Sequence, residues 1–305
     1  MQDTGNETEI VSNKRGANGF LRQVISIIMK QQISGFAQMV AYNVLFATAP
    51  LLMVVTAGAA SLTRVMYSDL ENPAQPVLDW MQENLPADAS SFLQQPIERA
   101  VNADTSWLFS IGALFALWGA RGAVAAIIRG LNVAYGIGKD PRPFIQHSLR
   151  SIGLTLLLVL LVAVGGVMFT LGTDVGGRIA ISIGMGDLWN TVSVAARWPV
   201  IVVVSVIAVM TLHRFGPAVK DPFVWYLPGS LFSVVGMYLV TSALSIWLGR
   251  SGGFSEAYGV FGSVLAFVMW LYFTSFVLLI GGVINAVVHQ WYLNDERVPD
   301  SAEAA

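Results

Sequence analysis

The sequence has no cysteine among its 305 residues and few charged side chains. The missing cysteines exclude disulfides, thiolate metal ligands and thiol nucleophiles. Charged residues make up 12% of the chain, against roughly 25% in soluble domains. Because 55% of the residues are apolar, the chain lacks the polar surface that a soluble protein of this length needs. The composition predicts an integral membrane protein whose apolar side chains face lipid.

The sequence also predicts neither a cleavable secretion signal nor a basic nucleic-acid-binding face. The first 30 residues hold no compact apolar region followed by a cleavage site, which argues against a cleavable signal peptide. The net charge is −2, whereas nucleic-acid binders carry a basic patch or arm. We therefore expect no nucleic-acid partner.

Residues typical of catalytic or metal sites are scarce as well. His147, His213 and His289 never fall at metal-ligand spacing, and we interpret them as interfacial side chains at cytoplasmic helix ends. No phosphate-binding glycine loop or serine nucleophile elbow is present. We therefore expect no enzymatic activity, no metal and no cofactor. An intramembrane enzyme is kept only as a third alternative, since no acid–base pair is evident.

Long uncharged runs define the expected helices, because about 20 mostly apolar residues cross a bilayer. Two further spans are interrupted by an arginine, since Arg121 lies within one and Arg197 directly precedes the other. We predict an all-α integral membrane protein, a bundle of six transmembrane helices. The spans are expected at about 36–62, 107–128, 151–173, 198–213, 225–248 and 259–288.

The remaining segments flank or connect this membrane domain of residues 31–292. Residues 1–30 and 293–305 are expected to be cytoplasmic segments, and residues 64–106 form a long outer loop. Apolar residues recur in the loop at helical spacing, which predicts short amphipathic helices. A solvated connector is the alternative. The apolar residues are Val77, Leu78, Met81, Leu85, Ile97 and Val101.

The distribution of Lys and Arg predicts the orientation, since cytoplasmic loops carry an excess of both. Eleven of the 17 basic residues, including every lysine, fall on the side of the N-terminus, and five fall on the other. The N-terminus is therefore expected in the cytoplasm, and six crossings return the C-terminus there.

Arg121 is the first candidate for a functional site, because charges inside a span are costly and usually functional. It follows Trp107 by 14 residues, about 21 Å of helix. Snorkelling toward the headgroups or a structural hydrogen bond is the alternative. No expected span contains Asp or Glu, so cation pumping is disfavoured, although a carboxylate from a loop could reach in. A buried arginine suits an anionic group on a solute or lipid.

Other polar residues of the spans are candidates to complete such a site. Pro50, Arg197 and Pro199 are candidates for a helix break or gate, since proline frees backbone carbonyls. For the polar side chains Gln38, Tyr42 and Asn43, the equally weighted alternative to ligand binding is that they hold helices together. Glycines such as Gly281 and Gly282 are interpreted as sites of close helix packing. The candidate ligand-binding residues beside Arg121 are Gln38, Tyr42, Asn43, Asn132 and Asn285.

Short motifs follow one another along the chain in a characteristic order and spacing. The motifs are Ala41-Tyr42 through Pro50, Leu117-Trp118-Gly119-Ala120-Arg121-Gly122, Leu131-Asn132, Tyr135-Gly136, Pro228-Gly229, Tyr258-Gly259, Trp270-Leu271-Tyr272 and Gly281-Gly282-Val283-Ile284-Asn285-Ala286. Together they resemble the YihY/BrkB family of bacterial inner-membrane proteins, once misnamed ribonuclease BN. The resemblance covers roughly residues 20–292.

The resemblance implies a six-helix protein of the bacterial inner membrane with an ill-defined activity. Roles suggested for the family include serum resistance, solute export and help with envelope lipid transport. One position departs from the pattern, because members often carry a glutamate where this chain has Val283. Any mechanism that needs a buried carboxylate at that position is therefore in doubt here.

Two hypotheses about function follow. The first is a transporter or exporter that moves an anionic or zwitterionic solute or lipid through a cavity between helices, with Arg121 holding the anionic group. The second is a non-transporting scaffold that acts in envelope integrity through a partner bound at the outer loop. Membrane lipids are expected partners in both, and a homo-oligomer or an envelope protein is a further partner to consider.

Overall fold

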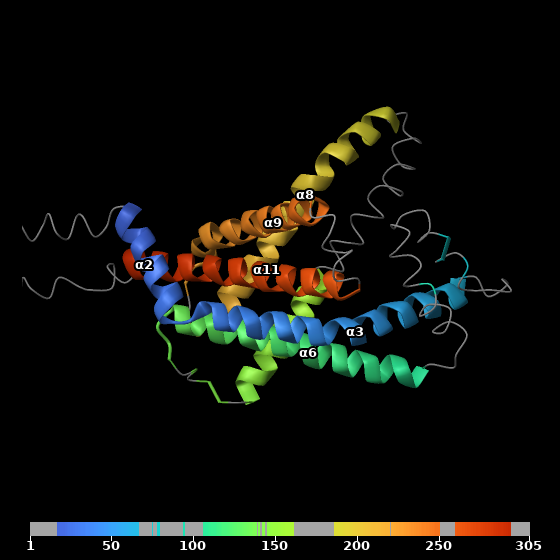
Figure 1. Cartoon of the computed structure of the whole chain (residues 1–305), viewed down its shortest axis with the longest axis horizontal. Helices are drawn as coiled ribbons and strands as arrows, with labels where there is room; N and C mark the ends of the chain where they lie inside the picture. Colours follow the sequence, from blue (N-terminus) through green and yellow to red (C-terminus); the bar gives the residue numbers. More distant parts are fainter. Residues whose placement is uncertain are drawn as a thin grey trace, which may run out of the picture. The chain divides into compact units, whose positions relative to one another are not determined.

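The computed structural model is helical throughout the part of the chain that it describes, with no strand there (Figure 1). The described residues are 17–66, 75, 78, 79, 94, 106–138, 140, 142, 143, 145–161, 186–219, 221–250 and 260–293. This confirms the all-α class. The number of membrane crossings stays a prediction.

Eight helical elements have defined bounds, and a further helix covers Ile145–Leu161. Three stretches within them are long and apolar enough to cross a membrane, namely Ile111–Ala134, Phe223–Leu248 and Val264–Trp291. The eight elements are α2 (Ala17–Lys30), α3 (Ile33–Met66), α6 (Ser106–Ala134), α8 (Gly186–Phe215), the 3₁₀ turn η1 (Phe223–Tyr226), α9 (Leu227–Arg250), α11 (Val260–Val288) and the π turn η2 (His289–Leu293).

The chain divides into two compact units, which are described separately. The first unit comprises residues 1–41 and 124–305, and the second comprises Tyr42–Ala123. In the second unit α3 and α6 run antiparallel, because Ala47 lies against Gly119 and Asn43 lies against Gly122. Two glycines of α6 thus let the α3 backbone approach closely, as small residues do in membrane helix pairs.

In the first unit α9 and α11 are antiparallel neighbours (Figure 1). Their closest approach joins Gly229 to Gly281, and Ser233 lies beside the same contact. Gly282 on the next position of α11 packs against Leu131 of α6. These contacts confirm that the glycine pair of the last helix serves close packing.

The structure adds a helix that the search for apolar runs misses. Part of the segment at residues 1–30 forms α2, which packs on the end of α11. Phe20 stacks edge-on against Trp291 at 5.5 Å between ring centroids. Gln23 donates to Gln290 at 2.6 Å. Because α2 has only 14 residues, it is too short to span a bilayer.

Most of the outer loop lies outside the described residues, including Val77, Met81, Leu85, Ile97 and Val101. Of the described positions, Leu78 is buried, and Gln75 donates to Asp79 at 3.0 Å one helical turn later. The amphipathic helices of this loop stay a prediction.

Candidate functional site

A buried polar network joins α8, α9 and α11 around His213, whose side chain is 1% exposed. The His213 Nε2 atom lies 3.2 Å from the carbonyl oxygen of Leu278, which only accepts hydrogen bonds. Nε2 therefore carries the proton, and Nδ1 accepts from Ser230 (3.2 Å) and Asn285 (3.1 Å). The network assigns His213 as a neutral imidazole inside the helix bundle, which corrects its interpretation as an interfacial side chain.

Asn285 is the second hub of this His213 network. Its Oδ1 atom accepts the backbone N–H of Gly229 at 2.8 Å, and its Nδ2 atom also donates to the carbonyl of Tyr226 at 3.2 Å. The first of these bonds satisfies the N–H of Gly229 at the start of α9, a group that lacks a partner within that helix. Asn285 therefore has a structural role, and ligand binding by it stays a prediction.

A second cluster gathers around Asp140, in the segment that follows α6. Arg142 donates its backbone N–H and its Nε–H to Asp140 Oδ1, at 3.0 and 2.8 Å. Asp140 Oδ2 accepts from Asn132 at 3.0 Å and lies 3.1 Å from His147 Nδ1. Asn132 Oδ1 accepts the N–H of Ala218 at 2.8 Å, which links this segment to the end of α8. Asn132 thus also has structural partners, and its role in ligand binding stays a prediction.

The neighbours of Asp140 in this cluster favour the charged form of its carboxyl. Burial alone would raise the pKa of the Asp140 carboxyl, but hydrogen bonds from Arg142 and His147 outweigh it, and the pKa lies below its ordinary value of 3.8. Such a carboxyl stabilises the fold above its unfolded pKa, and this contribution is lost as pH falls through the folded value.

Replacing Asp140 with asparagine is expected to lower the free energy of unfolding at neutral pH by about 1 kcal/mol, because Arg142 and His147 lose a charged acceptor. The difference from the wild type should begin to close near pH 3.8, the ordinary pKa, and should vanish as pH falls through the lower pKa of the folded state, where the native carboxyl also becomes neutral. Thermal unfolding in detergent, followed by tryptophan fluorescence over a pH series, measures this. A difference that is independent of pH would contradict it.

A third polar contact involves Asp221. This residue lies between two expected spans, so the sequence does not predict it as a buried carboxylate. Its Oδ2 atom lies 2.7 Å from His289 Nδ1, and the residue is only 3% exposed. Tyr135 packs on the His289 ring at 5.6 Å between centroids. Burial first, and then the charges of Tyr226 and Asp221, raise the pKa of the Tyr135 phenol. Asp221 precedes Pro222 in a loop, so a loop carboxylate does reach a buried position.

Arg121 and Asn43 lie close together in the second unit. Asn43 of α3 contacts Gly122, the residue that follows Arg121 on α6. The Arg121 guanidinium carbon lies 5.5 Å from the ring centroid of Trp118, within reach of a cation–π interaction. Arg121 is half-buried within an apolar helix. The candidate Asn43 thus lies against the residue that follows Arg121, and anion binding by either residue stays a prediction.

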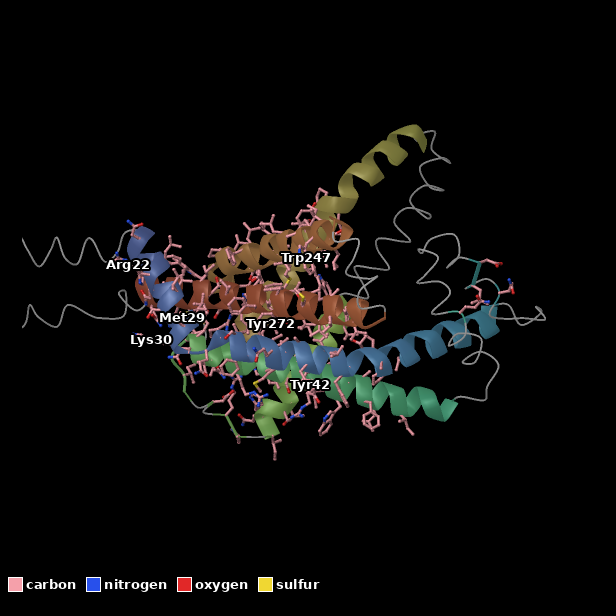
Figure 2. The ribbon with its side chains drawn as sticks, viewed as in Figure 1. Arg22, Met29, Lys30, Tyr42, Trp247 and Tyr272 are labelled. Atoms are coloured by element: carbon pink, nitrogen blue, oxygen red, sulfur yellow. The ribbon has the colours of Figure 1, made fainter. Side chains whose placement is uncertain are left out.

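The other predicted site residues differ in exposure. Tyr42 is 68% exposed (Figure 2) and Gln38 is exposed as well. The helices α3 and α8 continue through Pro50 and Pro199. Arg197 lies within α8, but its side chain is outside the described part. Ligand binding or gating by these residues stays a prediction.

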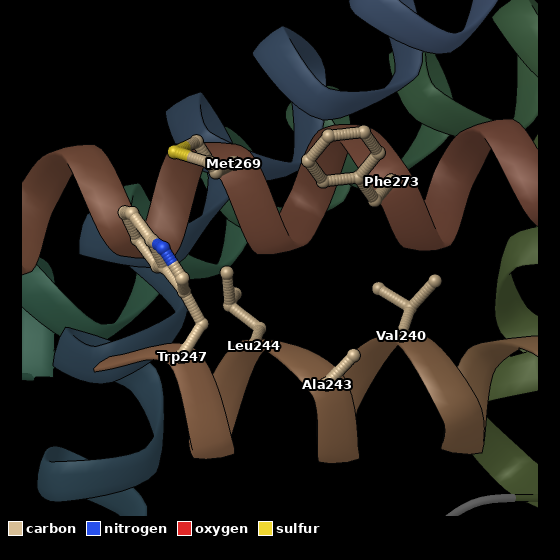
Figure 3. Close-up of a pocket in the computed structure, with 6 residues that line it drawn as sticks. All are labelled: Val240, Ala243, Leu244, Trp247, Met269 and Phe273. Carbon is tan, nitrogen blue, oxygen red and sulfur yellow. The ribbon is translucent and has the colours of Figure 1, made fainter. Parts of the chain in front are cut away.

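An apolar pocket of about 270 Å³ lies between α9 and α11. Trp247, Leu244 and Val240 of α9 face Met269 and Phe273 of α11 across it (Figure 3). The lining side chains are apolar apart from the indole N–H of Trp247, so the pocket suits hydrocarbon such as a lipid chain.

Comparison with known proteins identifies the family. The model of the family described as virulence factor BrkB matches residues 24–305. The chain belongs to the BrkB family. This confirms the resemblance found in the sequence motifs, and together with the three long apolar helices it makes the chain a membrane protein.

A curated relative of this BrkB-family protein is the putative ribonuclease-like protein YfkH of Bacillus subtilis (strain 168). It is 28% identical over 281 residues, which cover 92% of this chain and 98% of YfkH. No solved structure matches the chain. Within the described residues, no group of three or more His, Asp and Glu side chains is placed to hold a metal ion.

Val283, at the position where the sequence resemblance implies a glutamate in other members, is fully buried on α11. The polar groups of the bundle are supplied instead by His213, Asn285 and the serines of α9. His213 and Asp221 are the residues that sequence patterns miss, because their burial depends on contacts between distant segments.

Proposed function

We propose that this BrkB-family protein is a transporter or exporter of an anionic or zwitterionic solute or lipid, with Arg121 binding the anionic group. The observation that carries the proposal is the half-buried Arg121 in the middle of an apolar helix. Such arginines are costly in a membrane and pair well with phosphate or carboxylate. The proposal places the protein in the bacterial inner membrane, with six crossings and both termini in the cytoplasm.

The neighbours of Arg121 support an anion site. Trp118 lies beside the guanidinium and is exposed, so it is available to the apolar part of an amphiphile. Asn43 adds an amide next to the same turn of α6. Gln38, Tyr42, Asn132 and Asn285 are proposed to complete recognition along the path, while Pro50, Arg197 and Pro199 are proposed to allow the helices to open.

The experiment is native mass spectrometry of the gently purified protein, with Arg121→Leu and Arg121→Lys beside the wild type. Loss of one charge-assisted contact should lower ligand occupancy in Arg121→Leu by about 10- to 100-fold. Arg121→Lys keeps the charge without the bidentate geometry and should retain part of the ligand. Flux of the identified ligand in proteoliposomes should fall in the same order.

Unchanged occupancy and flux in a folded Arg121→Leu protein would overturn this proposal. Retention of an envelope protein instead of a small anion, equal in all three variants, would favour the scaffold hypothesis. Unfolding temperatures of the variants, measured by tryptophan fluorescence, separate loss of binding from loss of structure.

A further inference from the structure

The helix α2 presents two adjacent stripes of different chemistry. Leu21, Ile25 and Met29 are 56%, 58% and 73% exposed and recur every four residues, which places them on one face. Arg22 and Lys30 follow one position later and lie beside this apolar stripe (Figure 2). An apolar face bordered by basic residues is typical of helices that lie in the membrane interface.

The opposite face of α2 is fixed to the protein. Val24 is buried, Gln23 binds Gln290, and Phe20 packs on Trp291. Because these contacts already hold the helix on α11 and η2, the exposed apolar stripe is not needed for folding of this unit. The exposed apolar stripe is therefore free to contact another apolar environment.

A pocket of about 450 Å³ opens where α2 ends and α3 begins. Its lining contains both polar and apolar side chains, and a headgroup and the start of an acyl chain require both. The wall of the pocket includes Lys30, Gln31, Gln32, Gly35, Phe36 and Met39.

The backbone of this turn is unusual. Gln32 has φ of 49°, a left-handed conformation that costs a residue with a side chain about 1–2 kcal/mol. Strained residues of this kind gather at binding sites, where the surrounding structure maintains them. Gly35 faces open space, since an added Cβ would meet no atom within 4 Å.

We propose that this pocket binds an anionic phospholipid of the leaflet that surrounds α2. Lys30 and the amides of Gln31 and Gln32 hold the phosphate, and the acyl chain follows Phe36 and Met39. No Asp or Glu occurs between residues 17 and 66, so no carboxylate of this segment opposes the anion. The site does not rest on the proposed transport function, because it uses none of the residues around Arg121.

The experiment measures lipid retention by the full-length protein in native mass spectrometry, with phosphatidylglycerol and phosphatidylcholine added in equal amounts. The wild type should retain phosphatidylglycerol in preference. Lys30→Gln should lower its occupancy about fivefold, as expected for one basic residue at an anionic surface. Arg250→Gln removes the same charge at the far end of α9 and should leave retention unchanged.

A second variant tests the pocket without changing charge. Gly35→Leu fills the open space and should exclude the lipid while keeping the unfolding temperature of the wild type. Equal retention of both lipids by the wild type, or wild-type retention by Lys30→Gln and Gly35→Leu, would overturn the proposal. A dimer lost in Gly35→Leu would assign the pocket to a second copy of the chain and would overturn it too. Arg121→Leu should retain the lipid, which separates this site from the transport proposal.

Discussion

Replacing Gly229 with alanine is expected to destabilise the protein by about 3 kcal/mol or more, through overpacking and a lost hydrogen bond. An added Cβ would overlap the carbonyl oxygen of Gly281 and would lie 2.5 Å from Asn285 Oδ1. Because the nearest obstacle is backbone, no rotamer change relieves the clash, and α9 must move away from α11.

Movement of α9 would also disturb the His213 network. Asn285 accepts the N–H of Gly229 and donates to His213, so a shift of α9 breaks the first bond and strains the second. Groups left without partners in an apolar bundle cost about 1–3 kcal/mol each. The two effects share one cause, so their costs are not simply additive.

The measurement is thermal unfolding in detergent followed by tryptophan fluorescence, with nine tryptophans as reporters. A loss of this size corresponds to a fall of about 5 °C in the unfolding temperature of a chain of this length. Gly153→Ala is the matched control, because its added Cβ meets no atom within 4 Å and alanine favours a helix. Equal unfolding temperatures for the two variants would contradict the close helix contact.

Helix positions follow from the sequence where charges coincide with helix ends. The spans expected at 225–248 and 259–288 agree within two residues with α9, Leu227–Arg250, and α11, Val260–Val288. The span expected at 198–213 lies within α8, which begins at Gly186, and the place where α8 enters the membrane stays a prediction. Arg197 marks the expected start of burial in lipid, and a charge of this kind does not end a helix.

The sequence alone does not predict which polar residues of distant segments contact each other. The sequence indicates Asn285 as a polar residue in an apolar run, but it predicts an interfacial position for its partner His213. Asp221 lies in a loop, and its burial follows from contact with His289 on the last helical segment. Hydropathy records only the local composition, so it cannot show which loop residue folds back into the bundle. The amphipathic α2 was missed for a related reason, since a criterion of long apolar runs excludes short helices.

Breaking the contact between Asp221 and His289 is expected to have the second large effect. Replacing His289 with phenylalanine preserves a ring against Tyr135 but removes the partner at 2.7 Å from a carboxylate that is almost completely buried. An uncompensated buried charge of this kind costs about 3–5 kcal/mol. Asp221→Asn should cost less, because the amide is neutral and still presents an oxygen to His289.

The double variant decides whether the two residues act as a pair. If they do, combining Asp221→Asn with His289→Phe should cost clearly less than the sum of the single variants, because Asp221→Asn removes the charge that His289→Phe leaves without a partner. Asp79→Asn is the matched control, since it makes the same change at an exposed residue that bonds only one turn away. It should alter the free energy of unfolding by no more than about 0.5 kcal/mol. If the losses in free energy of unfolding are additive in the double variant, Asp221 is stabilised by groups other than His289. The contact between the two residues would then contribute little to holding the last helical segment against the loop before α9.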